Sequence, residues 1–572
     1  MGELLPAVGR RWQVGRGEMT ERNAESAALA LAAPFPVHDA AGAAHRRNMP
    51  LARWIWLGWL VVLMIGCGFV SISHGADGMW DLKNYHLYSP FAALNDRYDY
   101  DVAPAQQPGY LNPLLDYPFY FAVRLFNDYP RVIAFLMGLP QGVNLWLLGI
   151  MAWRISSEHS RVVRVGLTLI ATWIGGTGAG TLPLVGATTG DVVVSVPVLA
   201  AFVMLLRAVD ARPVSPIVRR SLLACGLLVG CAVGAKPTMG CYALGLCAAL
   251  LVVLPLQALP GALLRFAVAG GVGVVATGGY HALRLAKVFG NPMFPLANTL
   301  FHSPFWENAS FRDTRFLPKD LWEAVTFPFI WAAGTDHGVA AELGFRDIRV
   351  ALGLSAVVLA VATLLFARGD ARAPLPRSIL ALFVASVVAY VAWIAGFSIY
   401  RFLLPTEMLS GVLVLAALSQ IARPAAAPVL MAVAAFACSI TTLPLEWGHT
   451  PFRDHYVEVS APPIEPDALI LIVGSDPVAY FIPFMDPSAR WLGLDNNLLR
   501  PNQGNALVAR ERSLIERQSG AIMVMHAGAP PAEVSAVLAA YGLTEDADRC
   551  GQVSSNLGGE AYTLCSAHRA AG

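Results

Sequence analysis

Acidic side chains gather in residues 74–131, between the first two long apolar stretches of the chain, and many aromatic side chains accompany them. This mixture is typical of proton-transfer chemistry, because a carboxylate within hydrogen-bond reach of a hydroxyl can remove its proton. The polar candidates in the segment are Asp77, Asp81, Lys83, His86, Asp96, Asp99, Asp101 and Asp116.

Asp81 is expected near a membrane boundary, because it follows the apolar stretch 54–73 by about eight residues. Functional charges of membrane proteins usually lie at or inside this boundary. Three aspartates of the same segment, Asp77, Asp99 and Asp101, compete for the same role. The structural alternative is that Asp81 anchors the loop or caps a helix, as most loop aspartates do.

His86 and Asp191 are two further polar candidates, each with a structural alternative. His86 could orient a neighbouring carboxylate or contact a substrate phosphate, or it could belong to an aromatic cluster at the interface. Asp191 begins an apolar stretch after the turn TTGD. It could serve as a second acidic site residue, or Asp191 or Thr189 could cap the N-terminus of a helix, where acids are favoured.

Four basic residues lie at the ends of apolar stretches, separate from the arginine-rich loops of the chain. A cation in such a place can neutralise a lipid phosphate. The alternative is that these long side chains extend to lipid headgroups in general. The four residues are Lys236, Arg284, Lys287 and Arg401.

Membrane helices are the elements that must position these side chains. The chain has 572 residues, of which 56% are hydrophobic and 14% charged, with a mean hydropathy of +0.54. Soluble proteins average about 25% charged residues, and a spanning helix needs about 20 apolar residues. The sequence therefore predicts an all-α polytopic membrane protein with about eleven transmembrane helices. They are expected at 54–73, 132–153, 165–182, 190–206, 221–235, 240–264, 266–283, 350–367, 378–398, 402–422 and 425–445.

The distribution of arginines predicts the orientation, because short cytoplasmic loops carry an excess of Lys and Arg. With the N-terminus inside and the helices alternating, every inner loop is basic, whereas the short outer turn 183–189 has no Lys or Arg. This parity predicts a multi-pass membrane protein with its N-terminus in the cytoplasm. It places 74–131, 284–349 and the C-terminal tail on the outer, periplasmic face, and a miscount by one would separate Asp81 from Lys236 and Arg401.

Three regions follow from this layout. Residues 1–50 are rich in Arg and Ala without an apolar core and are expected to be a mostly disordered cytoplasmic tail. Residues 51–445 form the transmembrane domain. Residues 446–572 alternate strand-like runs with a helical stretch and predict a small periplasmic α/β domain.

Cysteine placement tests the orientation. Six cysteines lie in apolar stretches, where a free thiol behaves as a small hydrophobe. Only Cys550 and Cys565 lie in the C-terminal tail, residues 446–572, and an oxidising compartment would let them form a disulfide. The alternative is a pair of buried thiols.

Glycine-rich runs at 175–180 and 270–274 could cradle a phosphate, but in a membrane protein they favour close approach of helices. The run GAKPT at 234–238 has the wrong glycine spacing for a nucleotide loop, so ATP binding is not expected. A net charge of +1 gives no basis for nucleic-acid binding.

Three features together resemble the GT-C superfamily of membrane glycosyltransferases, which includes protein O-mannosyltransferases and aminoarabinose transferases of lipid A. The first long outer loop carries an Asp soon after the first span in a pattern like Asp-x-x-x-Tyr-His, here DLKNYH from Asp81 to His86. A second long outer loop opens with FGNPMFPLAN at 289–298, and an Arg–aromatic pair begins YRFLLP at 400–405. The resemblance covers about residues 54–445 and leaves the tail out.

The resemblance implies transfer of a sugar, usually with inversion, from a polyprenyl-phosphate carrier to a glycan, lipid or protein acceptor at the outer face. Asp81 is implied as the base by its match to the first-loop Asp. The departing lipid phosphate needs a cation or a metal. The loop lacks the adjacent acidic pair common in several of these families, so a divalent metal (Mg or Mn) stays an open question. The implied substrate-binding residues are His86, Asp191, Lys236, Arg284, Lys287 and Arg401.

Two other functions are compatible with the sequence. A transporter or lipid flippase of envelope glycan precursors would share the many helices, but such proteins commonly show internal repeats and charges at mid-membrane. No repeat is evident here, and the charges gather at one side. A non-enzymatic assembly component, with the tail as its docking domain, is the third alternative.

Overall fold

The computed structural model describes residues 45–570 except 212–214, 310, 312, 336–337, 367–374, 528–530 and 559–560. Most of the expected cytoplasmic tail, residues 1–44, therefore lies outside the described residues. Helix α2 (His45–His74) begins within the range assigned to that tail. The chain divides into two compact units, residues 1–63 and 64–572.

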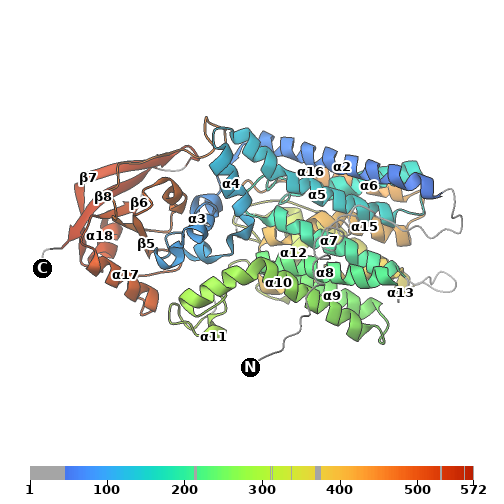
Figure 1. Ribbon diagram of the computed structural model, residues 1–572. Helices are drawn as coiled ribbons and strands as arrows, with labels where there is room; N and C mark the ends of the chain where they lie inside the picture. Colours follow the sequence, from blue (N-terminus) through green and yellow to red (C-terminus); the bar gives the residue numbers. More distant parts are fainter. Residues whose placement is uncertain are drawn as a thin grey trace, which may run out of the picture. The chain divides into compact units, whose positions relative to one another are not determined.

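Eight helices of the described residues are long and apolar enough to cross a membrane. They identify the chain as a polytopic membrane protein, and α5, α7 and α8 run alongside one another in Figure 1. Besides α2, the eight comprise α5 (Pro130–Ile155), α7 (Asp191–Asp210), α8 (Pro216–Ala235), α10 (Leu259–Phe289), α13 (Arg349–Phe366), α14 (Arg377–Gly396) and α15 (Leu404–Ile421), which continues from η7 (Tyr400–Leu403).

Three of the eleven predicted spans form shorter helices, so eleven crossings remain a prediction. These are α6 (Arg161–Gly176), α9 (Gly240–Val253) and α16 (Ala427–Thr441). The expected single stretch 240–264 is wrong in its second half, because α9 ends at Val253 and the chain turns before α10. Pro255 explains the break, since proline disfavours helical backbone at the residue before it.

Small residues form the seam between α8 and α10, as predicted for 270–274. A Cβ on Gly230 would lie 2.1 Å from the Gly270 carbonyl oxygen. A Cβ on Gly273 would lie 2.4 Å from the carbonyl oxygen of Leu227. The 175–180 run serves the same purpose on α6, where a Cβ on Gly175 would lie 2.2 Å from the Met408 carbonyl of α15. Both runs pack backbones together.

We expect Gly273→Ala to destabilise the protein by about 1–3 kcal/mol, because the added methyl group meets backbone that cannot move alone. Thermal melting of the detergent-purified protein measures the loss. Gly271→Ala is the matched control two residues away, since a Cβ there meets nothing within 4 Å. Equal melting temperatures for the two variants would contradict the role of the seam.

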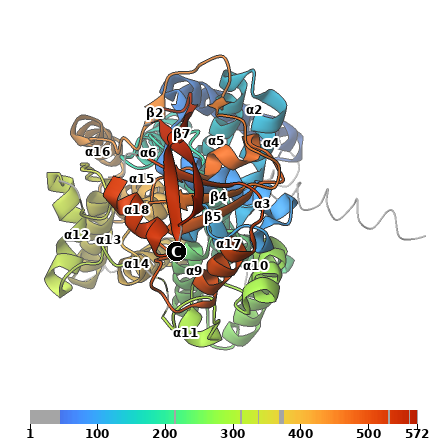
Figure 2. The same ribbon diagram turned by 90° about the vertical axis from the view of Figure 1, so that its left-hand side faces the viewer.

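The tail forms the predicted α/β domain, seen from its own side in Figure 2. Its six-stranded sheet has the order β3-β7-β8-β6-β4-β5. β4 is parallel to β5 and β6, and the other pairs are antiparallel. Its elements are β3 (Val459–Ser460), β4 (Leu469–Val473), η8 (Ala479–Phe484), β5 (Arg490–Asp495), α17 (Ala506–Arg517), β6 (Ile522–His526), α18 (Pro531–Ala539), β7 (Leu543–Ser555) and β8 (Tyr562–Arg569).

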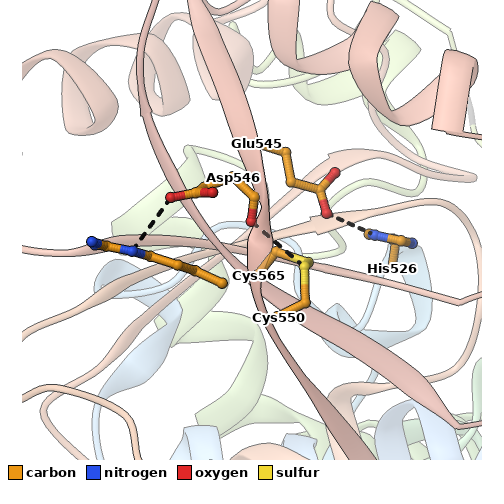
Figure 3. The surroundings of a disulfide bond; sticks show 6 residues. His526, Glu545, Asp546, Cys550 and Cys565 are labelled. Carbon is orange, nitrogen blue, oxygen red and sulfur yellow. Dashed lines mark hydrogen bonds and ion pairs between the residues drawn. A yellow bond between two sulfur atoms is a disulfide. The ribbon is translucent and has the colours of Figure 1, made fainter.

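The predicted disulfide is confirmed: Cys550 and Cys565 are bonded, as Figure 3 shows. The two residues lie opposite each other on β7 and β8. The bond therefore joins the two longest strands of the sheet, which are also connected by their ladder.

Loss of this disulfide should destabilise the tail domain by about 3 kcal/mol, the chain-entropy value for a loop of about 15 residues. Thermal melting with and without reductant measures the effect on the full-length protein. The Cys550→Ser/Cys565→Ser double variant should melt at the temperature of the reduced wild type and ignore reductant. A wild type indifferent to reductant would refute this expectation.

The segment after α2 folds into short elements rather than a loose loop. Asp77 in its first strand pairs with a strand of the tail. The elements are β1 (Ala76–Asp77), η1 (Leu82–His86), α3 (Tyr88–Leu94), η2 (Arg97–Asp99), η3 (Gln107–Tyr110), η4 (Pro113–Leu115), α4 (Tyr117–Phe126) and the pairing strand β2 (His449–Thr450). Elsewhere lie η5 (Pro237–Met239), α11 (Asn298–Phe301) and α12 (Leu321–Ala333).

The sheet of the C-terminal tail packs directly on residues 74–131, called the first segment from here on. Arg97 forms an ion pair with Asp101 at 2.7 Å and donates to the carbonyl of Pro487 at 2.8 Å. Asp101 accepts a hydrogen bond from the backbone N–H of Trp491 at 3.0 Å, and Val102 forms a parallel β-bridge to Leu492; both partners lie in β5. The tail is therefore part of the structure that holds the first segment in place.

Candidate functional site

Asp81 and Arg401 form an ion pair, although 320 residues separate them. Asp81 directly precedes η1, and Arg401 lies in η7 just before α15. The Asp81 side chain is only 12% exposed. Two residues nominated independently from the sequence therefore meet in one place.

Lys236 and Asp191 form a second ion pair, at 2.5 Å. Lys236 also donates to the Thr189 carbonyl at 3.2 Å. Asp191 is the acidic residue in the first turn of α7, whose N-cap is Gly190, so it also lies where the helix N-terminus favours a negative charge. Its Oδ2 atom is buried and has no partner among the described residues.

The Phe402 ring links the two ion pairs. The Lys236 Nζ atom lies 5.0 Å from the ring centroid, and the Arg401 Cζ atom lies 5.5 Å from it. Cations placed this close to an aromatic ring are attracted by its quadrupole. Both cations consequently belong to one site, at the end of the helices that carries the first segment and the tail sheet.

His86 and Asp116 form a third, buried pair in which Nδ1 of the ring lies 2.6 Å from a carboxylate oxygen. The Nε2 atom of His86 is buried and has no partner in the described part of the chain. Burial lowers the pKa of His86, but Asp116, then Asp81 and Asp77, raise it to a net value above the ordinary one. These carboxylates therefore favour the protonated form of the ring.

The electrostatics show that the three pairs act on one another. Burial opposes ionisation of Asp81, but Arg401, then His86 and Lys236, lower its pKa below the ordinary value. Burial raises the pKa of Asp116, although His86 and then Lys236 act in the opposite direction. Asp81 is thus ionised at neutral pH.

The competing aspartates have structural partners. Asp77 accepts hydrogen bonds from the backbone N–H and the hydroxyl of Thr188, at 2.8 and 2.7 Å. Asp101 holds Arg97, and Asp99 forms an ion pair with Arg510 of α17 at 2.8 Å. Of the four aspartates considered as the base, Asp81 is the one that faces the Lys236 and Arg401 cations.

Arg284 and Lys287 do not join the cluster. Arg284 forms an ion pair with Asp96 at 2.7 Å, donates to the Ala93 carbonyl and lies over the Tyr98 ring. Lys287 lies three residues farther along α10 and is exposed. Arg284 contacts Asp96, Ala93 and Tyr98 rather than Asp81 or Arg401, so it ties the end of α10 to the end of α3 and the segment after it.

Asp116 was one of the polar candidates of its segment but received no role from the sequence, because nothing local distinguishes it from the other loop carboxylates. Its position comes from Asn112, whose side chain donates to the carbonyls of Gly234 on α8 and Thr277 on α10, both at 2.9 Å. Leu115 packs on Gly190 at the start of α7. The segment carrying Asp116 is thereby fixed to the end of α8, the start of α7 and the middle of α10.

A fully buried network lies at the start of α15, the helix that follows Arg401. Glu407 on α15 accepts the backbone N–H groups of Gly180 and Thr181, at 3.2 and 2.9 Å. Asp347 accepts the Ala179 N–H at 2.7 Å and pairs with Arg349 at 2.8 Å. This network joins the start of α15, and hence η7, to the segment after α6.

The same network explains one glycine and one omission. A Cβ on Gly178 would lie 1.5 Å from a Glu407 carboxylate oxygen, so only glycine leaves room for that side chain. Glu407 was missed in the sequence because it lies within an apolar stretch. A lone carboxylate inside a predicted span was the signal that could have found it.

The cluster does not present a ligand set for a divalent metal. Each of its carboxylates, Asp81, Asp116 and Asp191, faces a cationic side chain. Three metal-type ligands come together among the described residues only at His526, Glu545 and Cys565 in the tail. Cys565 is bound in the disulfide there, so no thiolate is available (Figure 3).

Among the described residues, the three pairs leave the Asp191 Oδ2 and His86 Nε2 atoms buried without partners, while the Lys236 and Arg401 cations share the Phe402 ring. Such an arrangement can bind a phosphate and remove a proton from a nearby hydroxyl. No protein-family model, curated protein or solved structure matches the chain. The function must therefore be argued from this cluster and from the membrane setting of the chain.

Proposed function

We propose that the protein is an inverting membrane glycosyltransferase that moves a sugar from a polyprenyl-phosphate carrier to an acceptor at the outer face of the bacterial inner membrane. The observation that supports this most is the pairing of Asp81 with Arg401, next to Lys236. It combines a base with two cations at an end of the apolar helices, where a lipid phosphate would lie.

Charge balance suggests how the donor would activate the site. Without substrate, each cation is paired with a carboxylate, and the pKa of Asp81 is lowered chiefly by Arg401. A donor phosphate would compete for Arg401 and Lys236. As Arg401 turns toward the phosphate, the pKa of Asp81 rises, and the carboxylate becomes a stronger base when the substrate is in place.

The transfer step follows from these roles. The acceptor hydroxyl oxygen attacks the anomeric carbon from the face opposite the phosphate, and its proton passes to Asp81. The bond between the anomeric carbon and the phosphate oxygen breaks, and its electron pair stays on the phosphate. Arg401 and Lys236 stabilise the charge that grows there. Attack from the opposite face gives inversion.

The remaining features are consistent with an outer site. The Cys550–Cys565 disulfide suits an oxidising compartment, and the tail that contains it packs on the first segment. The proposed orientation has the N-terminus in the cytoplasm and the tail in the periplasm. Glycan, lipid and protein hydroxyls all remain candidate acceptors.

A transporter or flippase of lipid-linked precursors is the alternative. A transport path needs charged groups that are available to a passing ligand within the membrane. The buried charges of α13 and α15 are engaged with protein: Arg349 with Asp347, and Glu407 with the backbone of Gly180 and Thr181. The observations therefore favour the enzyme.

The test is transfer by the purified full-length protein in nanodiscs. Radiolabelled polyprenyl-phosphate sugars, each with a single sugar, are incubated with glycan, lipid and peptide acceptors, and the label is followed from the lipid to the acceptor fraction. We expect transfer from one donor class. Movement of labelled lipid between the leaflets of proteoliposomes, without transfer to any acceptor, would instead identify a flippase.

A further inference from the structure

The two ring nitrogens of His86 have different surroundings. Nδ1 faces the Asp116 carboxylate at 2.6 Å, while Nε2, on the other side of the ring, is buried without a partner among the described residues. His86 as a whole is 2% exposed. A buried polar atom without a partner is costly, and such atoms are rare in proteins unless a ligand or water completes them.

His526 shares this arrangement, with Nε2 facing Glu545 at 3.2 Å and Nδ1 buried without a partner among the described residues, but it lies in the tail domain. Two other histidines differ from His86. His281 places its Nε2 atom 3.0 Å from the Tyr110 carbonyl, so that nitrogen is engaged within the protein. His455 pairs with Asp128 at 2.9 Å, but both side chains are substantially exposed to solvent. His86 combines a carboxylate on one nitrogen with a buried, open second nitrogen next to Asp81.

We infer that His86, oriented by Asp116, donates a hydrogen bond from Nε2–H to the phosphate of the polyprenyl-phosphate carrier. This inference rests on the proposed function and adds a third cation to Arg401 and Lys236. Asp116 acts as a positioning residue, because it does not contact the substrate itself but orients the His86 ring that does.

The charged groups around His86 support a donor rather than a base. Asp116 at the start of α4 holds Nδ1, Asp81 precedes η1, and Asp77 lies in β1, while Lys236 acts on Asp116 from the end of α8. The three carboxylates raise the pKa of His86 above its ordinary value despite burial. A protonated ring has two N–H donors, one for Asp116 and one for a ligand.

The chemistry of transfer is balanced with His86 in this role. The hydroxyl proton goes to Asp81, and the electron pair of the broken bond between sugar and phosphate stays on the phosphate oxygen. His86 keeps its proton throughout and strengthens its hydrogen bond as negative charge grows on the phosphate. No additional acid or metal is required.

Binding of undecaprenyl phosphate, the carrier without any sugar, tests the inference independently of the sugar and the acceptor. The full-length protein in nanodiscs is titrated with radiolabelled undecaprenyl phosphate between pH 5.5 and 8.5. At pH 6 we expect His86→Gln to weaken binding by about tenfold or more, the value of a charge-assisted hydrogen bond. Comparing variants at each pH cancels the titration of the phosphate itself.

The pH dependence separates a donor from a structural residue. The advantage of wild type over His86→Gln should be full below the pKa of His86 and vanish as the pH rises through it. Asp116→Asn should move this loss to lower pH, because the neutral amide no longer favours the imidazolium. The exposed pair supplies the matched controls, His455→Gln and Asp128→Asn, which should bind as wild type does.

Each other outcome has one meaning. If wild type binds and His86→Gln binds equally well, the role of His86 is overturned while the proposed function stands. If the advantage of wild type grows with pH, His86 acts as a neutral acceptor and the inference is again overturned. If wild type binds no undecaprenyl phosphate, the carrier class of the proposed function fails, and the inference fails with it.

Discussion

Replacing Asp81 by Asn should lower the turnover of sugar transfer by about 10²- to 10⁴-fold, the usual contribution of a positioned general base. The amide keeps the shape of the side chain but cannot take the hydroxyl proton. Affinity for undecaprenyl phosphate should be kept or improved, because Arg401 loses its carboxylate partner and is free for the phosphate. Initial rates and carrier binding in nanodiscs measure the two effects separately.

The controls for this variant come from the same segment. Asp99→Asn also removes a carboxylate from an Asp–Arg pair, but Asp99 is 76% exposed and its partner Arg510 belongs to the tail. It should transfer sugar at the wild-type rate and change stability by less than about 1 kcal/mol. Turnover of Asp81→Asn near the wild-type value, in protein that melts normally, would remove Asp81 from the role of base.

Replacing Arg401 by Gln should weaken undecaprenyl phosphate binding by about 10- to 100-fold, because charge-assisted hydrogen bonds contribute about 1.5–3 kcal/mol. The same change leaves Asp81 largely buried without its cation, which costs on the order of 3 kcal/mol of folding stability. Both losses are measurable, by lipid titration and by thermal melting.

A double variant distinguishes the loss of binding from the loss of stability. Asp81→Asn/Arg401→Gln removes both charges, so it should melt closer to wild type than Arg401→Gln does, while remaining inactive and weak in lipid binding. Arg401→Lys keeps the charge without the planar fork and should fall between wild type and Arg401→Gln. If the double variant recovered both stability and lipid binding relative to Arg401→Gln, Arg401 would serve only to neutralise Asp81.

The sequence could predict those site residues whose place in the membrane follows from their position along the chain. Asp81, Asp191, Lys236 and Arg401 lie within a few residues of an apolar stretch, so composition alone places them at a boundary. The order of the stretches then assigns them to the same end. The two ion pairs among them are the tertiary counterpart of that assignment.

Arg284 and Lys287 show where this reasoning fails. They follow an apolar stretch like the others, but α10 has 31 residues and is about 46 Å long, more than a membrane core of about 30 Å requires. Its last turns extend to the tail domain, where Leu285 and Phe289 share an apolar core with Leu471 of β4. The two cations are thereby carried past the cluster.

The sequence by itself determined the membrane class, the long apolar helices, the α/β tail and its disulfide, because apolar runs, strand alternation and an isolated cysteine pair are local or compositional signals. Only the tertiary structure decided which carboxylate meets which cation and that Asp116 orients His86. It also decided that Glu407, Asp347 and Arg349 support η7. These pairings depend on the rotation and depth of helices fixed by glycine seams, and on hydrogen bonds between segments far apart in the chain. No local pattern encodes such contacts.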